Sequence, residues 1–181
     1  MTEELAKYQG RLDRLLFSES PDIFGNYSQP HAKCIFRTFF SVASESIDCL
    51  SGDFGTGIFQ EPGISDALRC AVIRGAHVRV ISLGTSAESM DNLRVLKETL
   101  NAVAAISGRG GSFDYRLGVV RDPHAEVQHY MVVDKKRYRL EAPHPAPVRE
   151  DVHAEVCCNG PVKGAYLTRD FESIWGRLSC P

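Results

Sequence analysis

Residues 71–81 read Ala-Val-Ile-Arg-Gly-Ala-His-Val-Arg-Val-Ile, and this stretch decides the fold class. Its first half ends a run of helical spacing that begins at Ile64, and Gly75 stands where a helix would take its C-cap. The β-branched residues of 77–82 then predict a strand. Another predicted strand, residues 46–51, precedes the helix. Because strand, helix and strand follow one another, the chain needs a parallel crossover, and we expect an α/β sheet covered by helices.

The same patterns extend in both directions from this unit. Helical spacing predicts further helices over residues 32–43, 88–106 and 162–178, and apolar runs predict further strands over residues 113–120 and 153–158. An amphipathic helix, residues 2–17, precedes a stretch expected to be a loop, residues 20–29. We therefore expect an N-terminal accessory helix within residues 1–20. One domain with a mixed, mostly parallel sheet flanked by helices is expected over residues 30–178.

The stretch from His129 to Glu141 predicts a hairpin with chemically active side chains on one face. An apolar strand ends in an Asp-Lys-Lys turn, and alternation resumes after it. Side chains two positions apart share a strand face, so His129 lies with Met131, and Arg139 lies with Glu141. A histidine and a glutamate on paired strands suggest catalysis. The alternative is a hydrogen-bonded histidine without a catalytic role, since imidazole titrates near neutrality in many settings.

Composition and charge narrow the class of protein. The chain has 181 residues with 43% hydrophobic composition, which suits one domain with an ordinary core. A formal net charge of -2 argues against a generally basic, sequence-independent nucleic-acid binder, so any phosphate site must be local. The six cysteines have no metal-ligand spacing, and we expect structural thiols, with no metal or cofactor. The N-terminus lacks a signal pattern, and no apolar run approaches the ~20 residues that span a bilayer, so we expect a cytoplasmic protein without a membrane partner.

Several short phrases follow one another in a recognisable order. They are Ser51-Gly52-Asp53-Phe54, the run over residues 71–81, Val132-Val133-Asp134 and Phe171-Glu172-Ser173-Ile174-Trp175. This order resembles one half of a phospholipase D superfamily protein, over roughly residues 30–176. The resemblance implies an active site built from two such halves. We therefore expect a homodimer, with both copies of His129 near its two-fold interface.

The resemblance also implies where the family's reactive residues would lie. Family members carry a His-x-Lys-x-x-x-x-Asp motif, in which the histidine attacks phosphorus and the lysine holds phosphate oxygens. If Asp134 matches the family aspartate, the histidine position falls on Val127 and the lysine position falls on His129. The family's Gly-Ser pair corresponds to Glu141 and the alanine that follows it, and its Asn-x-Glu pair corresponds to residues 153–155. The motif is therefore degenerate, although other positions that would line the same site are polar.

These matches predict a site that gathers histidines and carboxylates. The expected catalytic residues are His129, Asp134, Glu141, His153 and Glu155, and the expected substrate-binding residues are Lys135, Arg137, Arg139 and His144. In the favoured interpretation His129 is a relocated nucleophile, Glu155 or Glu141 orients its ring, and basic side chains balance phosphate charge. In a second, the histidines and glutamates bind a divalent metal that activates water, although no His-x-His spacing supports it. In a third, they form a hydrogen-bonded remnant or a binding pocket without turnover.

Two functions follow from these interpretations. The leading prediction is a phospholipase D-like phosphodiester hydrolase, a nuclease rather than a lipase, because the sequence offers no membrane-binding stretch. The alternative is a non-catalytic phospholipase D-like module that binds a nucleotide or nucleic acid, or that acts as a scaffold in a larger complex. The helix over residues 2–17 is a candidate contact for another protein in either case.

Overall fold

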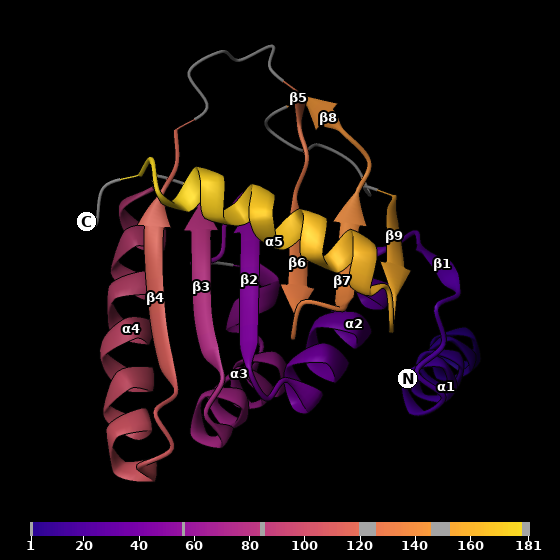
Figure 1. The fold of residues 1–181 in the computed structure, drawn as a ribbon, viewed down its shortest axis with the longest axis horizontal. Helices are drawn as coiled ribbons and strands as arrows, with labels where there is room; N and C mark the ends of the chain where they lie inside the picture. Colours follow the sequence, from indigo (N-terminus) through magenta and orange to yellow (C-terminus); the bar gives the residue numbers. More distant parts are fainter. Residues whose placement is uncertain (1, 56, 84–85, 120–125, 146–152, 179–181) are drawn as a thin grey trace.

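The computed structural model describes residues 2–55, 57–83, 86–119, 126–145 and 153–178. These residues form a sheet with helices on both faces (Figure 1). The helices are α1 (Glu3–Phe17), α2 (Gln29–Val42), the 3₁₀ helix η1 (Gly57–Gln60), α3 (Pro62–Arg74), α4 (Ala87–Ser107) and α5 (Pro161–Trp175). The strands are β1 (Ile23–Asn26), β2 (Ser46–Ser51), β3 (His77–Ser82), β4 (Ser112–Leu117), β5 (Glu126–Val127), β6 (Tyr130–Val133), β7 (Arg137–Glu141), β8 (His144–Pro145) and β9 (Ala154–Cys157).

The main sheet has the strand order β1-β9-β7-β6-β2-β3-β4. The strands β2, β3 and β4 are parallel neighbours, as the crossover pattern predicts. The strands β6, β7, β9 and β1 extend the sheet through antiparallel pairs. Consequently β1, β2, β3, β4 and β7 run in one direction, and β6 and β9 run in the other. The predicted mixed, mostly parallel α/β sheet is confirmed, and β5 pairs with β8 in a separate small sheet.

Local backbone chemistry explains where α3 ends and β3 begins. Gly75 has a φ of 110°, and its N–H donates to the carbonyl oxygen of Val72 at 3.0 Å. A side chain would be strained at this φ, and its Cβ would lie 3.0 Å from the carbonyl oxygen of Arg109. The glycine expected as a C-cap therefore turns the chain from α3 into β3.

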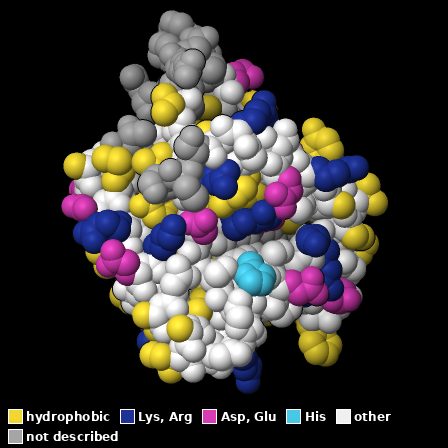
Figure 2. Space-filling model, turned by 60° about the vertical axis from the view of Figure 1, so that its left-hand side comes forward, with side chains coloured by type: hydrophobic (Ala, Val, Ile, Leu, Met, Phe, Trp, Pro, Cys, Tyr) yellow, Lys and Arg dark blue, Asp and Glu magenta, His cyan; other side chains and the backbone are white. Residues whose placement is uncertain are grey.

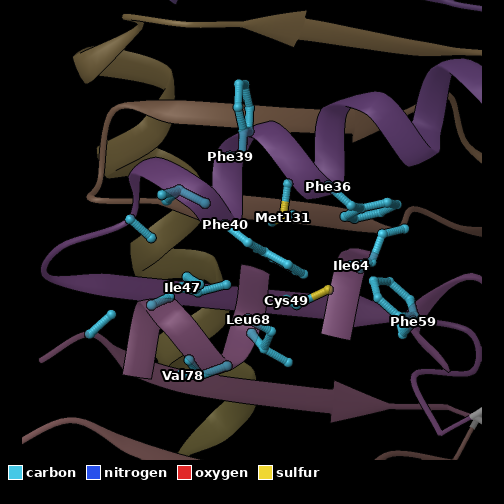
Figure 3. Close-up of a cluster of buried hydrophobic side chains, with 14 of the residues drawn as sticks. Phe36, Phe39, Phe40, Ile47, Cys49, Phe59, Ile64, Leu68, Val78 and Met131 are labelled. Carbon is cyan, nitrogen blue, oxygen red and sulfur yellow. The ribbon is translucent and has the colours of Figure 1, made fainter. Parts of the chain in front are cut away.

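Alternation along the strands divides the apolar side chains between two layers. One layer lies between the sheet and the helices α2, α3 and α4, and Figure 3 shows part of it. The labelled side chains are Phe36, Phe39 and Phe40 of α2, Phe59 of η1, Ile64 and Leu68 of α3, and Ile47, Cys49, Val78 and Met131 of the sheet. The other layer lies under α5, which crosses the opposite face in Figure 1. There Leu167 and Phe171 are buried with Tyr130, Val132 and Leu140.

The prediction of a loop over residues 20–29 is partly wrong, because this stretch contains β1. The strand pairs antiparallel with β9 at the edge of the sheet. Its side chains Phe24 and Asn26 are buried. A strand of four residues between Pro21 and Ser28 shows too little alternation to be distinguished from a loop by sequence pattern.

The N-terminal helix α1 packs against α2 at the β1 end of the sheet (Figure 1). Leu12 is completely buried in the main core. The Tyr8 hydroxyl donates to the carbonyl oxygen of Gly25 at 3.2 Å, and the Gln9 amide donates to the Thr38 hydroxyl at 3.0 Å. These contacts tie α1 to both α2 and the β1 backbone.

Among the residues that the structure describes, no helix has both the length and the apolar character needed to cross a membrane.

Candidate functional site

The start of β6, the end of β7 and the β5–β8 pair lie at the edge of the sheet where the parallel strands end, at the top of Figure 1. Tyr130, the first residue of β6, pairs with Leu50 near the end of β2, which places His129 at that edge. Glu141 ends β7, and its N–H donates to the carbonyl oxygen of His129 at 2.9 Å. In open α/β sheets, ligands commonly bind at this edge, in the crevice outside the carboxyl ends of the strands.

One carboxylate oxygen connects two imidazole rings in what we call the histidine–glutamate cluster, made of His129, Glu141 and His144. The Oε2 atom of Glu141 lies 3.0 Å from Nδ1 of His129 and 3.1 Å from Nε2 of His144. The two rings meet edge to face, with centroids 4.8 Å apart. The side chains of His129, Glu141 and His144 expose only 11%, 13% and 12% of their surface, so the cluster is largely shielded from water.

Arg139 occupies the other oxygen of the same carboxylate. Its Nη1 donates to Oε1 of Glu141 at 2.5 Å, and its Nε donates to Oδ1 of Asn26 at 2.7 Å. The guanidinium also lies 5.5 Å from the ring centroid of Phe36. Arg139 is therefore a buried support that holds Glu141 in place, joined to β1 through Asn26.

The charge state of Glu141 determines which protons the rings carry. Burial alone would raise the pKa of Glu141, but the hydrogen bond from His129 and the charge of Arg139 lower this pKa to about 2. The carboxylate is therefore ionised at neutral pH, and an ionised carboxylate only accepts hydrogen bonds. Nδ1 of His129 and Nε2 of His144 must donate to it. A neutral His129 ring then carries its lone pair on Nε2.

The short β5–β8 pair brings His144 to this place. In its register Val127 lies opposite His144. Residues directly opposite each other in an antiparallel pair share a face, and their side chains are neighbours. His144 therefore lies beside Val127, the position that the family resemblance assigned to the nucleophile, while His129 holds the position assigned to the lysine.

A glycine borders the other edge of the His129 ring. A Cβ added to Gly52, just after β2, would lie 3.0 Å from Cε1 and 3.3 Å from Nε2 of His129. Sequence reasoning missed Gly52 and Asn26 as site residues. Gly52 entered the analysis only within the phrase Ser51-Gly52-Asp53-Phe54, and Asn26 lay in the stretch expected to be a loop, so neither was predicted as a site residue.

Other predicted site residues lie elsewhere. Asp134, Lys135 and Arg137 lie at or beside the β6–β7 turn, at the opposite end of the sheet from His129. Glu155 pairs in register with Leu140, so it shares the sheet face that α5 covers, and its carboxylate lies 4.0 Å from the Lys163 ammonium. The structure does not bring these four residues to the histidine–glutamate cluster.

His153 lies nearer to the cluster but has a different ring contact. It precedes β9, and its carbonyl oxygen accepts from the N–H of Ala142, the residue after Glu141. Its ring meets the ring of Tyr27 edge to face, with centroids 5.1 Å apart. Of the residues expected to converge, three contact Glu141 directly: His129, His144 and Arg139. His153 lies at the same edge of the sheet.

Asp134 has a clear structural environment at its turn. Its carboxylate accepts from the backbone N–H groups of Ser44, Glu45 and Ser46 at 2.8–3.1 Å, and from Arg137 at 2.9 Å. Asp134 has a φ of 49°, which, with the left-handed residue after it, matches the backbone of a tight hairpin turn.

We expect Asp134→Ala to lower the free energy of unfolding by about 2 kcal/mol, because it removes charged hydrogen bonds between the hairpin and the start of β2. Urea denaturation measures this loss. Asp134→Asn is the control, since asparagine tolerates the left-handed backbone and keeps one acceptor oxygen, and it should lose less. Equal stability of the alanine variant and the native chain would contradict this role.

Charges of both signs are mixed over the described part of the face in Figure 2. Ion pairs within the fold include Lys97 with Asp114 at 2.6 Å and Arg94 with Glu98 at 3.2 Å. No single sign dominates this view among the described residues, which agrees with the formal net charge of -2. Attraction of a phosphate must therefore come from groups close to its binding site.

Solved structures share this arrangement of elements. Nuc from Salmonella typhimurium, a phospholipase D family member, is 18% identical, with a TM-score of 0.61 over 90% of this chain and 99% of its own. The chain has a phospholipase D-like fold. NucT from Helicobacter pylori is 11% identical, with a TM-score of 0.56 over 88% of this chain and 100% of its own. No sequence family model matches the chain, and no curated protein matches it in sequence.

A third similar structure is that of TrmBL2, an archaeal chromatin protein described as showing a novel mode of DNA binding. It is 15% identical, with a TM-score of 0.62, and the match covers 99% of this chain and 64% of TrmBL2. A match over 99% of the chain includes α1, which lies at residues 3–17. The span of this chain that matches TrmBL2 therefore contains both the sheet and α1.

Proposed function

We propose that this chain is a phospholipase D-like phosphodiester hydrolase, a nuclease, with a His129-centred site assembled in a homodimer. The observation that carries the proposal is the hydrogen bond from Nδ1 of His129 to Glu141, at 3.0 Å. A carboxylate that fixes the tautomer of an imidazole leaves Nε2 as the nucleophilic atom. The pair lies at the edge where a phospholipase D-like sheet would present its motif.

The proposed reaction uses His129 as a covalent catalyst. The lone pair of Nε2 attacks phosphorus, a phosphorus–nitrogen bond forms, and the bond from phosphorus to the leaving oxygen breaks. Glu141, held by Arg139, stabilises the positive charge that the imidazole ring gains. Water then attacks phosphorus and gives its proton to the group that protonated the leaving oxygen, and the phosphorus–nitrogen bond breaks to restore His129. We assign His144 to phosphate contact, since it shares the Glu141 carboxylate.

A homodimer would complete this chemistry. The leaving oxygen needs a proton, and a second copy related by a two-fold axis would bring a second His129 as its donor. The resemblance to a single half of a two-half family supports this assembly. The likeness to TrmBL2, whose description includes DNA binding, supports nucleic acid as the substrate class.

The test combines turnover with trapping of the intermediate. The native chain, with its mass measured by light scattering under assay conditions, is given bis-p-nitrophenyl phosphate and single- and double-stranded DNA and RNA, with and without EDTA. An alkaline quench preserves the acid-labile phosphohistidine for mapping by mass spectrometry. We expect turnover by a dimer and an adduct on the peptide that contains His129. A folded dimer without turnover on any of these substrates would overturn the proposal, as would activity that EDTA abolishes.

Gly52 provides a second test of the proposed nucleophile. A methyl group on residue 52 would lie 3.3 Å from Nε2 of His129 and would displace or cover the ring. We expect Gly52→Ala to lower kcat/KM by about a hundredfold, because small displacements of reacting groups cost this much. Gly63→Ala is the control, since its Cβ would make only an ordinary contact, 3.8 Å from Arg37. Equal kcat/KM for Gly52→Ala and Gly63→Ala would contradict the assignment.

The second candidate function is a non-catalytic module that binds nucleotide or nucleic acid, or a scaffold within a larger complex. The specific observation in its favour is that Val127 and His129 stand at the expected nucleophile and lysine positions. The match to TrmBL2 through α1 adds to it. Binding of labelled DNA by native chain that shows no hydrolysis would favour this candidate.

A further inference from the structure

We propose that the histidine–glutamate cluster is also a binding site for one divalent cation of the zinc type. Each of the three residues offers one ligand atom, and these atoms all lie within 4.8 Å of one another. Nδ1 of His129 and Nε2 of His144 are the ring nitrogens that contact Oε2 of Glu141. Two imidazoles and one carboxylate are a ligand set that holds zinc in proteins, with the fourth position left to water or substrate. The sequence spacing alone gave no such indication.

The distances are close to those that a metal requires. Zinc bonds of about 2.0–2.2 Å in a tetrahedron place neighbouring ligand atoms about 3.4 Å apart. The Glu141 oxygen lies 3.0 Å and 3.1 Å from the two ring nitrogens, so these separations must lengthen by roughly a few tenths of an ångström when an ion enters. Both rings already direct the relevant nitrogen at the same oxygen, and an ion can replace the two hydrogens that now lie between them.

The surroundings of the cluster would support this ion. Arg139, itself held by Asn26, fixes the carboxylate through its other oxygen and leaves Oε2 as the ligand atom. Outer contacts of this kind orient metal ligands. The guanidinium charge of Arg139 opposes a second positive charge, so the ion must be one that binds imidazole strongly. Imidazole ligands favour zinc, copper and nickel over magnesium and calcium.

The ion and the proposed nucleophile exclude each other. A metal on Nδ1 of His129 moves the ring proton to Nε2, which then has no lone pair for attack on phosphorus. This consequence rests on the proposed function, whereas the binding itself does not. The chain should therefore hydrolyse its substrate after EDTA has removed metal ions, and added zinc should inhibit this hydrolysis once the EDTA is gone.

The test measures binding of the metal alone. The full chain, freed of any affinity tag and carrying Cys70→Ser to remove the thiol that is exposed among the described residues, is titrated with Zn²⁺ by calorimetry and with Co²⁺ by absorption spectroscopy. We expect one ion per chain and a Co²⁺ spectrum without the charge-transfer bands of thiolate ligands. His144→Ala and Glu141→Gln should each weaken binding about tenfold or more. His77→Ala, a change at the far end of β3, should leave it unchanged.

The outcomes separate this site from the proposed reaction. Absence of Zn²⁺ binding to the folded chain would overturn the inference, and so would equal affinity in native chain, His144→Ala and Glu141→Gln. Thiolate bands in the Co²⁺ spectrum would also overturn it, because they would place the ion on cysteine. Binding with these ligands by a chain that hydrolyses nothing would support the metal site and overturn only the proposed function.

Discussion

The His129→Ala variant is expected to lower kcat/KM for phosphodiester hydrolysis by a factor on the order of 10³ or more. The substitution removes the atom that forms the covalent bond to phosphorus, so the loss should fall on kcat rather than on KM. Stability should fall as well, because the variant loses the His129 hydrogen bond that helps to lower the pKa of Glu141, although Glu141 keeps its contacts with Arg139 and His144. Steady-state kinetics on bis-p-nitrophenyl phosphate, with urea denaturation of the same preparations, measures both quantities.

Two further variants make this result specific. His129→Gln keeps a side-chain N–H that can donate to Glu141 but offers no nucleophile, so it should be as inactive as the alanine variant. His77→Ala changes an exposed histidine whose ring contacts Ser112 at 2.9 Å, and it should retain native kinetics. Rescue of activity by glutamine would show that His129 acts as a hydrogen-bond donor rather than as a nucleophile.

The fold was predictable because short sequence patterns indicate each element of its central unit. Residues 71–81 contain the end of a helix, its glycine cap and a β-branched strand, and these features fix a parallel crossover without knowledge of the rest of the chain. The edge strand β1 was not predictable in the same way. Its pairing with β9 joins segments about 130 positions apart, and a strand of four residues contains little periodicity.

The candidate site was also predictable only where local patterns determine it. His129 and Glu141 lie on the two strands of one hairpin, so alternation alone predicts that they approach each other. His144 joins them only through the two-residue β5–β8 pair, which carries almost no sequence signal. Glu155 was wrongly predicted to join the site. The β7–β9 register places it opposite Leu140 rather than opposite Glu141. Because neighbouring positions on a strand point to opposite faces, Glu155 lies on the other face of the sheet from Glu141.

The ionised state of Glu141 is expected to make the protein less stable in acid. The pKa of Glu141 falls from the ordinary 4.5 to about 2 in the folded protein, because hydrogen bonds and charge from His129 and Arg139 outweigh its burial. A lowered pKa stabilises the folded state fully above about pH 4.5, and this contribution is lost as the pH falls toward 2. A gap from 4.5 to about 2 corresponds to about 3 kcal/mol of unfolding free energy.

Glu141→Gln isolates this contribution, because glutamine resembles the protonated carboxyl group at every pH. Native and variant chains should differ by about 3 kcal/mol in unfolding free energy at pH 7, and their curves should converge as the pH approaches 2. Urea denaturation across this range measures both curves. Glu98→Gln, at an exposed pair with Arg94 on α4, is the control and should follow the native curve throughout. Parallel native and Glu141→Gln curves would mean that Arg139 and His129 do not hold Glu141 ionised, and the nucleophile proposed at His129 would lose the charge that fixes its tautomer.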